Sequence, residues 1–143
     1  MEELVHLHLT VNARVDPTFA EFSKEKAQAF VDELMGITGM KPLGPLNWAD
    51  ATDLDFPGQS IVQMITTSHS SLHYFSDTKE IYFDIYSCKQ YDYKKVLKLL
   101  DRTFMIKEWH GVLYNRANGK EPKVKSVGSE KVIIVAREPS LFK

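Results

Sequence analysis

Residues 5–12 alternate without exception between apolar and polar side chains, with valine or leucine at odd positions and histidine, threonine or asparagine at even ones. A period of two is typical of a β-strand that buries one face and exposes the other. Residues 80–87 repeat this pattern, and residues 60–66 are rich in the β-branched side chains that favour strands. The chain is therefore expected to form a sheet with one apolar face, and that face needs a second layer to cover it.

Two amphipathic segments can supply this layer. Between residues 19 and 34, apolar side chains recur at helical spacing, and in residues 92–104 a similar stripe lies opposite several lysines. Asp16 is a good N-cap residue, and Pro17 suits the first position of a helix. We therefore expect one helix that begins at Asp16 and ends near Met35, and a second over residues 92–104.

The remaining segments carry weaker signals. Proline and glycine are frequent in residues 41–58, which predicts irregular structure with a short strand over residues 46–49. Residues 109–114 and 132–136 are further strand candidates. The lysine-rich residues 120–125 between them are expected to form a solvated loop.

The balance of elements predicts the fold class. Strands outnumber the two helices and several connections are short enough for hairpins, which indicates an α+β two-layer sandwich with a mostly antiparallel sheet and both main helices on one face. The chain has 143 residues, 43% of them hydrophobic, so residues 1–143 are expected to fold as a single domain. His6 and His8 lie on the polar side of the first strand, so the uncovered face should be mixed and suited to a pocket. Large exposed apolar patches are rare on monomers, and the whole uncovered face is therefore not expected to stay in contact with water. This favours a two-fold dimer.

Charge and cysteine content argue against several classes of function. Lysine and arginine number 18 against 19 aspartates and glutamates, a net charge of −1, so nothing favours nucleic acid or an anionic membrane as a partner. No apolar run approaches the roughly 20 residues that span a bilayer, and the chain opens Met-Glu-Glu rather than with a basic leader. Cys88 has no partner for an internal disulfide, so we expect a cytoplasmic protein.

Isolated residues indicate little about the chemistry. His6 and His8 are two residues apart and His69 and His73 are four apart, but neither pair comes with a complete ligand set, so we expect no metal. Cys88 with His73 could form a thiolate–imidazole nucleophile, as in cysteine hydrolases. A single cysteine at a strand end is more often a small buried apolar residue.

Three motifs together are more specific. They are Gly-Gln-Ser at 58–60, Thr-Ser-His-Ser-Ser-Leu-His at 67–73 and Asp-Ile-Tyr-Ser-Cys at 84–88. In this order and at these intervals they resemble the motifs of the prokaryotic S-adenosylmethionine decarboxylase proenzymes. The resemblance extends more weakly over residues 4–115.

The resemblance implies that the chain processes itself and gives each motif residue a role. Ser68 is the processing serine: its hydroxyl attacks the carbonyl of Thr67, and elimination splits the chain between Thr67 and Ser68. The cofactor, a pyruvoyl group, is left at residue 68. His73 is implied as the proton acceptor of the elimination, and Ser60 as a processing-site hydroxyl. Cys88 is implied as the acid that reprotonates the substrate α-carbon.

The same resemblance implies the reaction and the assembly. The small-molecule substrate is S-adenosylmethionine, and its decarboxylation leads to spermidine. Phe56 and Asp77 are implied as substrate-binding residues, and no metal is needed. The protein is expected to be a homodimer with its active site near the subunit boundary, built from residues of both subunits.

The chain departs from the family pattern near the active site. Thr67 replaces a glutamate, Phe-Ser-Asp at 75–77 replaces Trp-Pro-Glu, and Lys89 replaces a glycine. Thr67 favours one alternative, an unprocessed non-catalytic homologue that keeps the fold and the ligand pocket. The change at 75–77 favours another, a decarboxylase of a different amino acid such as arginine or ornithine.

Overall fold

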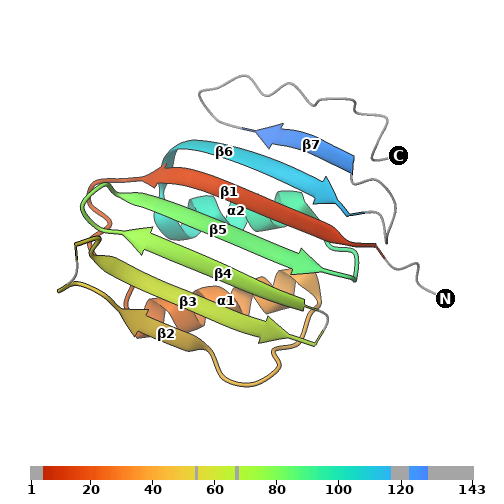
Figure 1. Cartoon of the computed structure of the whole chain (residues 1–143), viewed down its shortest axis with the longest axis horizontal. Helices are drawn as coiled ribbons and strands as arrows, with labels where there is room; N and C mark the ends of the chain where they lie inside the picture. The colour runs from red at the N-terminus through yellow and green to blue at the C-terminus, as the bar shows by residue number, and fades with distance from the viewer. Residues whose placement is uncertain (1–4, 54, 67, 117–122, 129–143) are drawn as a thin grey trace.

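The computed structural model describes residues 5–53, 55–66, 68–116 and 123–128. In this part of the chain, seven strands form one sheet and two helices lie on one face of it (Figure 1). The expected α+β two-layer sandwich is therefore confirmed. The elements in chain order are β1 (Leu7–Val15), α1 (Lys24–Thr38), β2 (Asn47–Asp50), β3 (Gly58–Ile65), β4 (Ser68–Phe75), β5 (Glu80–Ser87), α2 (Tyr93–Phe104), β6 (Ile106–Asn115) and β7 (Lys123–Gly128).

β1 lies inside the sheet, between β5 and β6. The strand order is β2-β3-β4-β5-β1-β6-β7, and each neighbouring pair is antiparallel. Since β5 and β6 both pair with β1, they run in the same direction, and such strands need a crossover rather than a hairpin. α2 makes this crossover, and α1 connects β1 to the edge strand β2. Both helices cross the same face of the sheet.

The covered face of the sheet and the two helices enclose the core. The residues at odd positions of β1 are at most 8% exposed. The ring of Phe104 in α2 lies 5.0 Å from that of Phe19 and 5.2 Å from that of Phe22, between centroids. It also lies 5.8 Å from the ring of Phe30 in α1. These contacts between aromatic rings join both helices to the segment that precedes α1.

The expectation that the first helix begins at Asp16 is wrong, because α1 begins at Lys24. The Asp16 carboxylate instead accepts a hydrogen bond from the Thr18 N–H at 2.8 Å and closes a turn. Phe22 donates its N–H to the side-chain oxygen of the buried Gln59 at 3.0 Å. The phenylalanines of this segment have helical spacing, but tertiary contacts hold their backbone in an irregular path.

The caps of α1 explain where it begins and ends. Ser23 is the N-cap, and its side chain accepts a hydrogen bond from the first turn. Gly39 has a φ of 69° and donates its N–H to the Met35 carbonyl. Glycine adopts this left-handed conformation without strain, so the helix runs to Thr38 rather than to the expected Met35. No helix of the described residues is long and apolar enough to cross a membrane.

Two features of the sheet differ from expectation. Residues 68–75 form β4, which the apolar pattern does not predict because serines and histidines occupy most of its positions. The expectation of a loop over residues 120–125 is wrong for the C-terminal part of this range, because β7 begins at Lys123 and pairs with β6. Lysines suit such an edge strand, where they discourage further pairing. The strand expected over residues 132–136 lies outside the described residues.

Gly58 provides a test of this packing, because its backbone lies against that of β4. A Cβ at this position would lie 1.7 Å from the carbonyl oxygen of Tyr74, whose residue is 1% exposed. We expect Gly58→Ala to lower the free energy of unfolding by about 3 kcal/mol, measured by urea denaturation. The control Gly36→Ala, in α1 with nothing within 4 Å, should raise it by about 0.5 kcal/mol. Equal midpoints for the two variants would contradict the close approach.

Candidate active site

The face of the sheet that the helices leave open carries two of the candidate residues, Ser60 and His73. Outward side chains of β3, β4, β5 and β1 are neighbours there because these strands are adjacent. The face is mixed, as expected: it includes several histidines, and Val62 and Met64 are 41% and 54% exposed on it. It can therefore hold both a polar site and an apolar contact.

Ser68 and Cys88 lie next to each other at one end of the sheet. Ser68 is the first residue of β4 and pairs with Ser87, the last residue of β5. The backbone N–H of Cys88 donates to the Ser68 Oγ at 3.1 Å. The Cys88 carbonyl accepts a hydrogen bond from the Val5 N–H at 3.0 Å, which ties this residue to the N-terminal segment. The expected processing serine and the expected acid are thus neighbours, while Thr67 lies outside the described residues.

Ser60 and His73 form a second pair. They face each other across β3 and β4, and the Ser60 Oγ lies 2.8 Å from the His73 Nδ1. His73 is exposed on the open face of the sheet. A hydroxyl and an imidazole at this distance can exchange a proton or orient one another.

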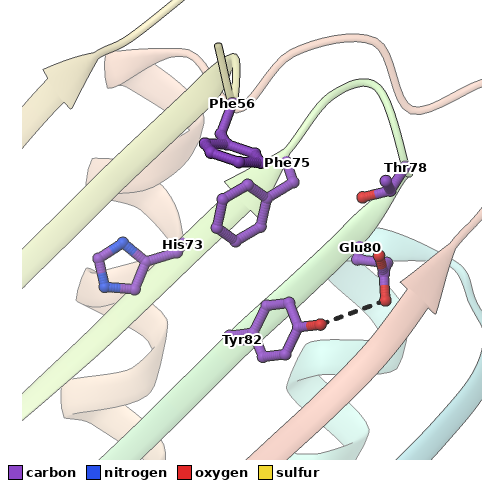
Figure 2. Close-up of a pocket in the computed structure, with 6 residues that line it drawn as sticks. All are labelled: Phe56, His73, Phe75, Thr78, Glu80 and Tyr82. Atoms are coloured by element: carbon purple, nitrogen blue, oxygen red, sulfur yellow. Dashed lines mark hydrogen bonds between the residues drawn. The ribbon is translucent and has the colours of Figure 1, made fainter. Parts of the chain in front are cut away.

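A pocket of about 490 Å³ adjoins this second pair (Figure 2). The ring of Phe75 meets that of Tyr82 edge to face at 5.6 Å, and the Tyr82 hydroxyl donates to the Glu80 carboxylate at 3.3 Å. The negative charge of Glu80 raises the pKa of Tyr82, so the phenol stays protonated. The described residues that line the pocket are Phe56, His73, Phe75, Thr78, Glu80 and Tyr82.

The pocket includes one of the two expected substrate-binding residues. Phe56 lines it and is 78% exposed. Asp77 lies in the turn between β4 and β5 and is not among the lining residues. Glu80 is the carboxylate that the pocket contains. The sequence does carry a signal for Glu80 and Tyr82, because both occupy outward positions in the alternating pattern of residues 80–87.

Within one chain, the two pairs do not form a single site. His73 follows Ser68 by five residues on β4, a separation of about 17 Å at roughly 3.3 Å per residue. Five is odd, so the two side chains also belong to opposite faces: Ser68 shares the face of the buried Leu72, and His73 lies on the open face. The motif residues thus gather as Ser68 with Cys88 and, separately, Ser60 with His73.

A third group is not evident from the spacing of residues. His8 of β1 and His69 of β4 both face Asp84 of β5: their Nε2 atoms lie 2.7 Å and 3.6 Å from the Asp84 Oδ2. Burial raises the pKa of Asp84, but hydrogen bonds from His8 and Ser71 and the two nearby imidazoles outweigh it, so the pKa lies below its ordinary value. The carboxylate is therefore ionised at neutral pH.

The chain matches one family of known proteins over most of its length. The model of the S-adenosylmethionine decarboxylase family matches residues 9–117. The chain belongs to this family. No curated protein matches it.

A solved structure of the family has the same fold. The adenosylmethionine decarboxylase from Aquifex aeolicus VF5 is similar to this chain with a TM-score of 0.66 and 15% sequence identity. The similarity covers 83% of this chain and 96% of that one. The α+β sandwich described above is therefore the fold of an S-adenosylmethionine decarboxylase.

Proposed function

We propose that this member of the family is a pyruvoyl-dependent decarboxylase of S-adenosylmethionine that forms its cofactor by cleavage between Thr67 and Ser68. The hydrogen bond from the Cys88 backbone N–H to the Ser68 hydroxyl carries the proposal, because it makes the processing serine and the residue expected to supply the acid neighbours at one end of the sheet. We further propose a role in spermidine synthesis in the cytoplasm, as the family resemblance implies.

Cleavage would follow from the chemistry of a serine placed after a peptide carbonyl. The Ser68 Oγ attacks the Thr67 carbonyl carbon, and the peptide C–N bond breaks as an ester forms. Removal of the α-proton of residue 68 then expels the Thr67 carboxylate. Water converts the remaining enamine at residue 68 to a pyruvoyl group with loss of ammonia. Every protein bond that changes belongs to these two residues.

The fold can tolerate a break at this position. The cleaved peptide bond would lie in the short connection between β3, which ends at Ile65, and β4, which begins at Ser68. Residues 1–67 contain β1, and β1 pairs on both sides with strands of the second fragment, β5 and β6. β3 of the first fragment likewise pairs with β4 of the second. The fragments therefore interlock and can stay together without the covalent link.

The residues near Ser68 and the pocket support a role in protonating and binding the substrate. The pyruvoyl group, when present, withdraws the electron pair left on the α-carbon as carbon dioxide departs. A thiol carries a proton that it can donate, and Cys88 is next to residue 68. The rings of Phe56, Phe75 and Tyr82 offer surfaces for an adenine ring and a sulfonium cation. The Glu80 carboxylate adds a favourable charge for that cation.

We further propose a homodimer that packs through the open face, with its active site near the subunit boundary, as the family resemblance implies. Two copies packed open face to open face, with their strands in opposite directions, would place His73 of the partner subunit over the end of the sheet where Cys88 lies, while the Ser68 side chain belongs to the opposite, helix-covered face. Val62 and Met64 are exposed apolar side chains on this face and suit such a contact. Because His73 and Ser68 of one chain lie on opposite faces of β4, His73 of the same chain does not face Ser68.

Self-processing predicts two fragments, residues 1–67 and 68–143. Intact-mass spectrometry of the wild-type protein should find both, and native chromatography should elute them together because their strands interlock. Ser68→Ala should remain full length, since no hydroxyl is left to attack. A single full-length mass for the wild type after prolonged incubation at physiological temperature would reject self-processing and favour the non-catalytic homologue.

His73 and Cys88 are expected to act at different steps. His73→Ala should slow or stop maturation, whereas Cys88→Ala should mature and then release carbon dioxide from S-adenosylmethionine about 10²- to 10⁴-fold more slowly. Fragment masses measure the first step, and carbon dioxide release measures the second. A mature Cys88→Ala protein that formed the correct product at the wild-type rate would show that Cys88 is not the acid.

The proposed homodimer can be tested by measuring its mass in solution. Light scattering at micromolar concentration should give a molecular mass twice the 16.4 kDa of one chain. Met64→Glu places a charge on the open face and is expected to shift the protein to monomers. Met105→Glu is the matched control, because Met105 is 46% exposed but follows α2 on the helical side of the molecule. A wild-type protein that stays near 16.4 kDa on concentration, or equal effects of the two variants, would contradict a dimer through the open face.

A further inference from the structure

The group formed by His8, His69 and Asp84 has a composition and geometry that the proposed reaction does not use. His8 and His69 come from different strands, and both are paired in register with Tyr86 of β5. Asp84 lies two residues before Tyr86 on the same face, so it is the diagonal neighbour of both histidines. One potential ligand atom from each residue lies within 4.8 Å of the other two.

The carboxylate is oriented toward the imidazoles. Its Oδ1 accepts hydrogen bonds from the backbone N–H of Ser71, at 3.1 Å, and from the Ser71 hydroxyl. This leaves Oδ2 directed at the two Nε2 atoms. Hydrogen bonds of this kind fix the ligands of metal sites and tune their affinity. The Asp84 carboxylate is thus held in place before any ligand binds.

The two rings are also restrained. The ring of Tyr86 lies 5.7 Å from that of His8 and 5.8 Å from that of His69. The side chains of His8 and Asp84 are 23% and 21% exposed, whereas that of His69 is 45% exposed. The group is therefore half-buried and open on one side, so that an ion could enter and keep one solvent position.

His69 distinguishes an ion site from a simple hydrogen-bonded pair. His8 and Asp84 alone are satisfied by their contact at 2.7 Å. The His69 Nε2, at 3.6 Å from the Asp84 Oδ2, faces the same oxygen beyond hydrogen-bonding distance. Ligand atoms about 2.0 to 2.1 Å from a tetrahedral zinc ion stand roughly 3.4 Å apart. The His69 contact is already close to that separation, and His8 needs a shift of less than about 1 Å to reach it.

We propose that His8, His69 and Asp84 form a binding site for a divalent cation of the zinc class, with a fourth position open to solvent or to a ligand. Two imidazole nitrogens and one carboxylate oxygen are typical zinc ligands, and three protein ligands leave an open position. His8 belongs to the fragment 1–67, and the other two ligands belong to the fragment 68–143. A bound ion therefore also links the two fragments across β1, β4 and β5.

Zinc binding to the tag-free, chelator-treated protein tests the site directly. Equilibrium dialysis against Zn²⁺ should give one ion per chain, and Zn²⁺ should raise the melting temperature. His69→Gln should weaken Zn²⁺ binding at least about tenfold, and Zn²⁺ should no longer raise the melting temperature of this variant. His110→Gln is the matched control, because His110 is exposed at an outward position of β6, away from the group. It should bind zinc like the wild type.

Further variants distinguish this site from zinc bound at Cys88 or at a cleaved chain end. His8→Gln should weaken binding as His69→Gln does, and circular dichroism without metal checks that both variants fold. Cys88→Ser should leave binding unchanged, and the Co²⁺ complex should lack a thiolate charge-transfer band. Ser68→Ala should still bind, so the result does not depend on self-processing. No saturable zinc site in the wild type, or equal binding by His69→Gln and His110→Gln, would overturn the proposal.

Discussion

The pairing of β1 with both β5 and β6 is the constraint on which the rest of the structure depends. It forces β5 and β6 to run in the same direction, so the chain between them must cross the sheet, and α2 does so over the apolar face. α1 follows the C-terminal end of β1 and crosses the same face of the sheet before β2. One face is thereby sealed by two helices, and the opposite face of the same strands is left open for chemistry.

This division between faces explains which parts of the fold can be read from the sequence. Strict alternation predicts β1 and β5 well, because each has one buried and one open face. It fails for β4, where Ser70 is buried through a hydrogen bond to the backbone of β5 and not through an apolar side chain. It also misleads before α1: the spacing of Phe19 and Phe22 is helical, yet Gln59, a distant residue, holds that backbone. Such contacts depend on tertiary structure, which local periodicity does not contain.

The candidate site illustrates a second limit. The resemblance of the motifs predicts Ser60, Ser68, His73 and Cys88 as site residues, and the family match supports the fold in which they lie. Spacing alone does not say which of them meet. Once β4 is known to be a strand, however, the five residues between Ser68 and His73 require opposite faces. The arrangement in two pairs is therefore a consequence of strand geometry.

The group of His8, His69 and Asp84 requires the complete strand order. Proximity in sequence pairs His6 with His8 and His69 with His73, but alternation and register instead join His8 to His69 across β5. Along β5 the outward residues are Glu80, Tyr82, Asp84 and Tyr86, so one strand contributes first to the pocket and then to this group. Tyr82 separates the two regions, with Glu80 on its pocket side. A cation at Asp84 would therefore lie about 7 Å along the strand from the wall of the pocket, close enough for its charge to act on what binds there.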